Sequence, residues 1–308
     1  MEDVLLVRSP GEALDAAAGG RRIRGWSTTP PGASISHAPT IAPYAERAPI
    51  AVLGGSVAQG VADRWSDVDT LVYWDAIDRD WLETPRAAAG GERFTWVEHY
   101  PGNACLEQYR FGTVKADVAH VRLGWLDELI DGVLSGENTD TTSLDVLRGV
   151  QEAIVLFGEE RYEPIRARVL DYPEALRRSM VEAHLKFSPS WIYDGTGRDR
   201  GDLVVFYEYV LATMRNVVGV LAGLNRVYVA PEKLKRIGAV VSRMELAPPD
   251  AAARLDALLD LPREQVKPEL DDLVARTLDL VDEHLPEVET AHAREVWSLP
   301  AQPSDAPP

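Results

Sequence analysis

Asp67 and Asp69 are the residues whose types and spacing most directly indicate chemistry in this chain. One residue separates them, and an apolar run typical of a strand follows at residues 71–74. Because side chains alternate between the two faces of a strand, both carboxylates are expected on one face. Two neighbouring carboxylates repel each other unless a cation lies between them, and a divalent metal prefers such oxygen ligands. The pair therefore predicts a divalent-metal site.

A glycine-serine turn precedes the aspartates. Gly54, Gly55 and Ser56 follow the apolar run at residues 49–53. Two glycines allow a sharp turn and a close approach of the backbone to a ligand, because neither has a Cβ atom. Backbone N–H groups at the start of a following helix favour an anion, and the serine adds a hydroxyl donor. The pattern predicts strand, turn, short helix and strand, with a phosphate site beside the metal site.

A third carboxylate is expected from Asp117. It lies in the middle of a predicted strand, after a hairpin turn at residues 111–113, and alanine and valine surround it. An aspartate in an apolar setting is costly unless it is paired or bound to a metal. A partnered core or edge-strand residue is the alternative reading, and Glu107 is the second choice for the third carboxylate. His120 should face the other side of the strand and is not expected to be catalytic.

These motifs together resemble the DNA polymerase β-like nucleotidyltransferase superfamily, whose small-molecule branch includes the aminoglycoside and lincosamide nucleotidyltransferases. The resemblance is specific over roughly residues 45–122 and loose over the helical remainder. It implies that three catalytic carboxylates hold one or two Mg²⁺ ions, namely Asp67, Asp69 and Asp117. It also implies triphosphate contacts from Gly55, Ser56 and a helical-domain lysine, for which Lys233 is the closest match. Gly54 and Ser66, which adjoin the turn and the first aspartate, are expected to contact nucleotide as well.

The organisation predicted for the chain is α+β, a small mixed-sheet catalytic domain followed by a larger helical bundle. We expect an N-terminal extension at residues 1–36, the catalytic domain at 37–123, the helical substrate-binding domain at 124–299 and a disordered tail at 300–308. Beyond Gly124 the apolar residues recur at helical spacing, through Ile154 and onward. Long helices are expected at about 161–187, 202–226, 232–245, 250–261 and 268–285.

Composition limits the choice of partners. The 308 residues carry a formal net charge of −17, which argues against extended nucleic-acid binding and suits a small acceptor, a cationic one included. A single cysteine excludes an intramolecular disulfide and is compatible with a reducing cytoplasm. We expect neither a signal peptide nor a membrane span, because no apolar run approaches twenty residues.

The function expected from these features is Mg²⁺-dependent transfer of a nucleoside monophosphate, by default AMP from ATP, to a hydroxyl of a small molecule, with release of pyrophosphate. An antibiotic-like or natural-product acceptor follows from family analogy alone. Two alternatives stay open: an antitoxin or regulator that AMPylates proteins with the same fold, and a non-catalytic nucleotide-binding module. The sequence leaves the acceptor, the base and the oligomeric state undecided.

Overall fold

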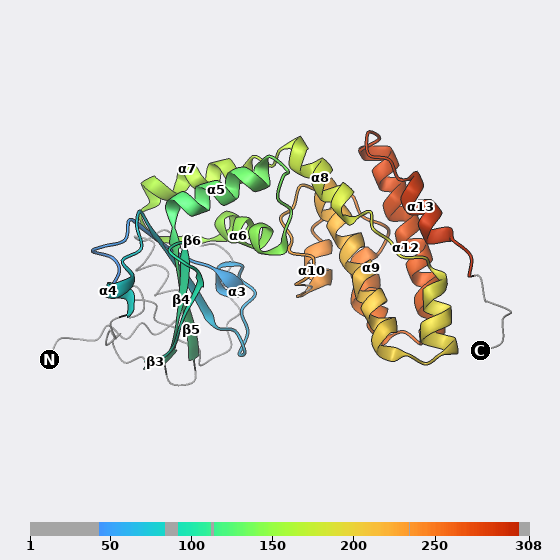
Figure 1. The fold of residues 1–308 in the computed structure, drawn as a ribbon, viewed down its shortest axis with the longest axis horizontal. Coiled ribbons are helices and arrows are strands. Elements are labelled where there is room, and N and C mark those ends of the chain that lie inside the picture. Colours follow the sequence, from blue (N-terminus) through green and yellow to red (C-terminus); the bar gives the residue numbers. More distant parts are fainter. Residues whose placement is uncertain (1–42, 84–91, 112–113, 234, 302–308) are drawn as a thin grey trace. The chain divides into compact units, whose positions relative to one another are not determined.

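The computed structural model describes residues 43–83, 92–111, 114–233 and 235–301. The expected extension at residues 1–36 and nearly all of the expected tail lie outside these ranges. The chain divides into two compact units (Figure 1). The first, here the sheet unit, comprises Met1–Ile130 and Gly149–Asp171. The second, here the helical unit, comprises Asp131–Arg148 and Tyr172–Pro308. The fold class is α+β, as predicted.

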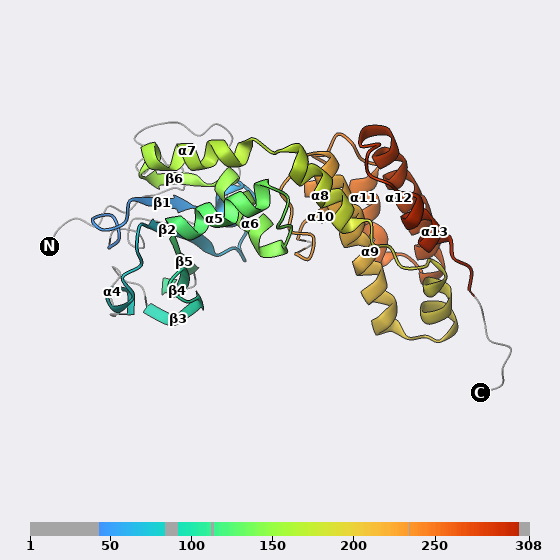
Figure 2. The ribbon, with the colours of Figure 1, turned by 45° about the horizontal axis from the view of Figure 1, so that its top comes forward.

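A mixed sheet forms the centre of the sheet unit. Its six strands are β1 (Ile50–Leu53), β2 (Val68–Trp74), β3 (Glu92–Tyr100), β4 (Ala104–Phe111), β5 (Val114–Arg122) and β6 (Ile154–Phe157). Their order in the sheet is β3-β4-β5-β2-β1-β6, which can be followed in Figure 2. β2 and β5 are parallel, whereas the other neighbouring pairs are antiparallel. The single parallel pair matters most for the site.

Most strands form where the alternation of apolar residues predicted them. The four residues of β1 are completely buried, as their continuous apolar run indicates. The strand expected at residues 92–100 is confirmed as β3, and β4 and β5 flank the predicted hairpin turn. The core of this unit combines aliphatic residues with Tyr44, Trp74 and Tyr109.

The strand β6 contradicts the helical pattern expected there. Ile154–Phe157 pairs with β1 and places residues 149–171 in the sheet unit rather than in the predicted helical region. A run of four apolar residues has too little length for its periodicity to separate a strand from a buried helical turn. The sequence boundary at residue 124 therefore misses this return of the chain to the sheet.

Among the described residues between 55 and 170, five helices accompany the strands. They are α3 (Gly55–Ala58), α4 (Arg79–Glu83), α5 (Leu123–Leu134), α6 (Thr141–Glu152) and α7 (Glu159–Leu170). α3 has only four residues and connects β1 to the loop before β2. It corresponds to the short helix predicted after the glycine-serine turn.

The helical unit contains most of the remaining elements. They are α8 (Glu174–His184), a π-helix (Tyr193–Asp199), α9 (Leu203–Leu224), α10 (Ile237–Val241), α11 (Ala251–Ala257), a 3₁₀ turn (Leu258–Asp260), α12 (Arg263–His284) and α13 (Ala291–Ser298). The long helix expected at 161–187 is wrong: α7 and α8 are separate. Pro173 explains the break, because a proline disfavours helical backbone in the residue before it.

α9 is the central helix of this unit. It is the one described helix that is long and apolar enough to cross a membrane by length and composition. The sequence reading, which found no such apolar run, overlooked it. Here its C-terminal half is buried, with Val220 and Leu224 packed against Val181 of α8 and Val281 of α12. The apolar surface of this C-terminal half is thus used for packing between helices.

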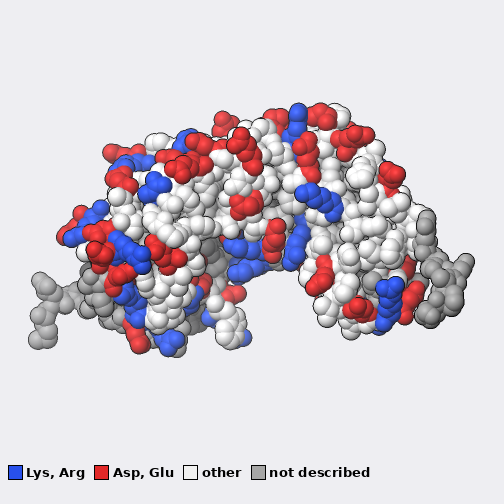
Figure 3. Space-filling view, in the orientation of Figure 1, with Lys and Arg blue, Asp and Glu red and all other residues white. Residues whose placement is uncertain are grey.

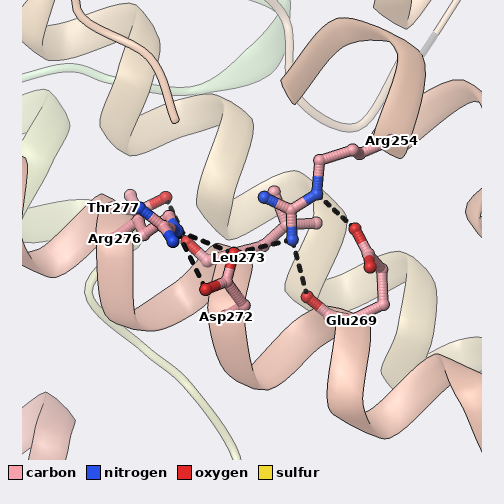
Figure 4. A network of polar contacts seen from close by, with 6 residues as sticks. All are labelled: Arg254, Glu269, Asp272, Leu273, Arg276 and Thr277. Carbon is pink, nitrogen blue, oxygen red and sulfur yellow. Dashed lines mark hydrogen bonds and ion pairs between the residues drawn. The ribbon is translucent and has the colours of Figure 1, made fainter. Parts of the chain in front are cut away.

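Charged side chains cover much of the surface. On the face shown in Figure 3, acidic and basic side chains of the described residues are interspersed. Several of them link helices, as Figure 4 shows for α11 and α12. Arg254 of α11 contacts Glu269 and lies 2.9 Å from Asp272, which also pairs with Arg276 at 2.8 Å. Such a network fixes α11 against α12.

Candidate active site

Three aspartates meet where β2 begins beside β5. Asp69 of β2 and Asp117 of β5 are direct neighbours in the parallel register, so their side chains leave the same face of the sheet. Asp67 lies one residue before β2, not within the strand as predicted. Even so, one oxygen from each carboxylate lies within 4.8 Å of the others, and all three residues are half-buried. The structure therefore brings together the three predicted carboxylates.

The glycine-serine turn packs directly against this cluster. The Gly54 amide donates a 2.8 Å hydrogen bond to the carbonyl oxygen of Asp69. Gly55 has φ +60°, and a Cβ atom there would lie 1.8 Å from Asp69 Oδ2. Only glycine fits this position, since the backbone is left-handed and the carboxylate touches it. The turn and the carboxylates therefore form one site.

Ser56 occupies the first turn of α3. Its hydroxyl forms no hydrogen bond with any residue that the structure describes, and the residue is half-buried. The first N–H groups of a helix have no intrahelical acceptor, so this turn offers donors beside the carboxylates. The role of Ser56 and the two glycines in nucleotide binding stays a prediction.

The loop before Asp67 is held by its own hydrogen bonds. Ser66 Oγ accepts from the Asp63 amide at 2.9 Å and donates to Asp63 Oδ1 at 3.1 Å. The Trp65 amide donates to the same carboxylate oxygen at 2.9 Å. The indole of Trp65 is 81% exposed, and the Arg64 guanidinium stacks on it. Ser66 thus shapes the loop that presents Asp67, and its predicted contact with nucleotide is a separate, open point.

Lys115 is the site residue that sequence reasoning missed. Its ammonium lies 2.8 Å from Asp117 Oδ2 and 3.2 Å from Asp67 Oδ2. Partial burial alone would lower the pKa of Lys115, but the hydrogen bonds to Asp117 and Asp67 outweigh it and raise the pKa. Two-residue spacing on a strand places Lys115 and Asp117 on one face, and that signal was available in the sequence.

Asp117 has a second partner on the neighbouring strand. Gln108 of β4 faces it in the antiparallel register and donates its side-chain amide to both carboxylate oxygens, at 3.2 and 3.3 Å. The Asp117 side chain is 17% exposed, compared with 40% for Asp67. Asp117 is therefore the more firmly held of these two carboxylates.

Glu107, the second choice for the third carboxylate, is not part of the cluster. It is completely buried on the other face of the sheet. Tyr44 donates to its Oε2 at 3.2 Å, Tyr109 donates to the same oxygen, and His120 Nε2 lies 3.3 Å from Oε1. His120 is also completely buried there, as its predicted position on the opposite face requires.

Lys233 does not begin a helix, contrary to the prediction. It lies in a turn before α10 and forms a 2.6 Å ion pair with Asp145 of α6, which also pairs with Arg148. These residues all belong to the helical unit. The predicted contact of Lys233 with a triphosphate stays untested.

The donor set suits a magnesium ion. Mg²⁺ is held in proteins by one or two carboxylates together with water and substrate phosphates. Asp67, Asp69 and Asp117 supply hard oxygen ligands, and no nitrogen or sulfur ligand joins them in the group that the described residues form. Lys115 places one positive charge beside two of them.

Comparisons with known proteins add little. No family model matches the chain, and no curated protein matches it. Among the solved structures that match is one described as a nucleotidyltransferase-like protein from Exiguobacterium sibiricum 255-15, with a TM-score of 0.39 and 15% identity. It covers 80% of this chain and 76% of the other. A likeness of this extent carries no functional conclusion.

Proposed function

We propose that this protein is a metal-dependent nucleotidyltransferase that moves a nucleoside monophosphate, AMP from ATP by default, to a hydroxyl of a small molecule. The observation that carries the proposal is the cluster of three aspartates with oxygens within 4.8 Å, joined directly to a glycine turn. A site for a divalent cation beside a site for phosphates is what a nucleoside triphosphate requires.

Each group in the site has a defined task in this reaction. Asp67, Asp69 and Asp117 would hold one or two Mg²⁺ ions, which when bound neutralise charge on the phosphates and polarise them. The amides of the turn and the Ser56 hydroxyl would bind the β- and γ-phosphates. Asp117 would accept the proton of the acceptor hydroxyl. Lys233 is proposed to neutralise triphosphate charge, with its pairing to Asp145 as the competing contact.

The covalent change is an in-line displacement. The acceptor oxygen forms a bond to the α-phosphorus, and the bond from that phosphorus to the oxygen bridging to the β-phosphorus breaks. The electron pair leaves with pyrophosphate. Most of the rate enhancement in such a site comes from holding the reacting groups in line and from charge stabilisation.

The proposed acceptor is a small cationic molecule that carries a hydroxyl, with antibiotic-like compounds as the first to test. The net charge of −17 favours a cation over a polyanion. An extended nucleic acid would need a broad basic surface, which this net charge disfavours. We propose a cytoplasmic location, because a single cysteine is compatible with a reducing compartment.

The experiment combines the protein with Mg²⁺, ATP labelled at the α-phosphate and a panel of hydroxyl-bearing amines. Transfer predicts pyrophosphate release and an acceptor heavier by one nucleoside monophosphate. The Asp69→Asn variant, which keeps the size of the side chain, is the matched control. Parallel reactions with the other three nucleoside triphosphates determine the base preference.

Two results would replace the proposal with one of its alternatives. Label that moves to a protein band in a cell lysate, and to no small molecule, would indicate a protein-AMPylating enzyme. Nucleotide binding without pyrophosphate release for any acceptor would indicate a non-catalytic binding module.

A further inference from the structure

Lys115 occupies the position that a divalent cation would need. Its ammonium lies within hydrogen-bond distance of two of the three clustered carboxylates. An ammonium and a metal ion both neutralise carboxylates, and they cannot share the same oxygen without bringing two positive charges together. Occupation of the site by metal and the observed position of Lys115 are therefore in competition.

The two contacts of Lys115 differ in strength. The contact with Asp117 is shorter, 2.8 Å against 3.2 Å for Asp67, and Asp117 is further held by Gln108. Asp67 is more exposed and follows a loop rather than lying in a strand. The weaker contact, with Asp67, is therefore the one that breaks more readily.

We propose that Lys115 is a resident counter-cation, which a divalent metal ion displaces from Asp67 while the lysine stays on Asp117. Without metal, Lys115 offsets one of the three negative charges of the cluster, and it lowers the affinity of the cluster for metal alone. The inference rests on the metal site of the proposed function but not on nucleotidyl transfer itself. Its consequence is that metal binds tightly only together with a ligand that adds negative charge, such as a triphosphate.

The test measures Mn²⁺ binding to the protein without nucleotide, from the paramagnetic resonance signal of the free ion. Lys115→Met removes the charge and keeps the length of the side chain. We expect its affinity for Mn²⁺ to rise on the order of tenfold, because a competing cation has gone. Lys115→Arg, which keeps the charge, should bind Mn²⁺ as the unmodified protein does.

Two controls separate this effect from general electrostatics. Lys267→Met removes one charge from a lysine that also pairs with an aspartate, Asp271, at 2.6 Å in the helical unit. It should leave the affinity unchanged. Asp69→Asn removes a charged ligand from the site, so the Mn²⁺ that it still binds measures binding to other carboxylates of this acidic chain.

Thermal unfolding supplies a second readout. Without metal, Lys115→Met should melt at a lower temperature than the unmodified protein, because three carboxylates lose their counter-cation. Saturation with Mn²⁺ should raise its melting temperature by more than it raises that of the unmodified protein, since tighter binding stabilises the native state further.

Folded Lys115→Met with unchanged or weaker Mn²⁺ affinity would overturn the inference, and so would Lys115→Arg binding as tightly as Lys115→Met. These outcomes are distinguishable from failure of the proposed function. Tighter binding in Lys115→Met without any nucleotidyl transfer would leave the inference standing and remove only the function. If the unmodified protein transfers nucleotide but binds Mn²⁺ as tightly as Lys115→Met does, the proposed function stands and the inference about Lys115 fails.

Discussion

Carboxylates on the two faces of the sheet differ in burial and in the kind of partner that holds them. Glu107 and Asp117 lie on the adjacent strands β4 and β5, yet they face opposite sides. Glu107 is completely buried, and tyrosine hydroxyls and a histidine nitrogen surround it. Asp117 stays partly exposed beside two other aspartates, and the ammonium of Lys115 is its counter-charge.

This difference separates a structural carboxylate from one available to ligands. The groups around Glu107 are held in the core: Trp74 donates to His120 Nδ1 at 3.1 Å, and His120 Nε2 lies 3.3 Å from Glu107 Oε1. A buried charge needs such partners, because desolvation is otherwise too costly. On the other face the partner is an ammonium at the end of a flexible side chain, and a metal ion can replace it.

Asp69→Asn should produce the largest change on the ligand-binding face. Loss of a charged ligand weakens a metal ion that contributes several kcal/mol to the transition state, so transfer should fall by at least about 10³-fold. The fold should persist, since the substitution relieves repulsion among the aspartates. Pyrophosphate release and circular dichroism on the same sample check both points, and turnover near that of the unmodified protein would exclude Asp69 from the reaction.

Glu107→Ala should produce the opposite outcome on the buried face. Removal of one member of a buried charged network costs about 3–5 kcal/mol in the free energy of unfolding. Urea denaturation measures this cost. Transfer per folded molecule should stay unchanged, and a stable variant with reduced transfer would show that the two faces do not divide their roles in this way.

Ser56→Ala tests whether the turn belongs to the ligand-binding face. A hydrogen bond to a charged phosphate is worth about 1.5–3 kcal/mol, so nucleotide affinity should fall by the corresponding factor. Calorimetry with ATP measures it, and affinity for the acceptor serves as the internal control. An unchanged nucleotide Kd would mean that Ser56 does not contact phosphate.

Asp140 provides a third arrangement, a carboxylate held by backbone amides. Its Oδ1 accepts from the amides of Thr142 and Ser143 at the start of α6. Burial would raise the pKa of Asp140, but the hydrogen bonds from Ser143 and its neighbours lower it overall. Asp140→Ala should therefore cost about 0.5–2 kcal/mol at neutral pH.

The sign of the pH dependence follows from the depressed pKa of Asp140. Its stabilisation is fully present above the unfolded pKa of about 3.9 and disappears as the pH falls through the lower folded value. The stability difference between the unmodified protein and Asp140→Ala should shrink accordingly in acid. Asp140→Asn still caps the helix but should lose this pH dependence. If stability fell with pH in the same way in Asp140→Asn and in the unmodified protein, the pH dependence would not come from the Asp140 carboxylate.

Local sequence signals predicted the part of the site that lies close together in the chain. The spacing of Asp67 and Asp69, and the glycines before them, required only strand alternation and turn chemistry. Asp117 was predicted from its apolar surroundings, and the parallel pairing of β2 with β5 brings it to the other two. The sheet itself was predicted except for β6, whose four residues carry too little periodicity.

Long-range pairing accounts for what the sequence did not predict. Alternation places Lys115 on the face of Asp117, but its contact with Asp67, 48 residues away, depends on the register of two strands. Asp117 was ranked before Glu107 from its position after the hairpin turn, but only the register of β4 and β5 shows that the two carboxylates lie on opposite faces. The segment around Lys233 was predicted to begin a helix, because proline and charged residues occur both in turns and at the start of helices.

The central claim is that Asp117 acts in the reaction and does not merely support the fold. Asp117→Asn, with melting temperature, nucleotide affinity and turnover measured on one preparation, tests it most directly. We predict nucleotide binding, a melting temperature close to that of the unmodified protein and transfer reduced by about 10²–10⁴-fold or more. A destabilised variant whose folded fraction transfers nucleotide at the normal rate would contradict the account.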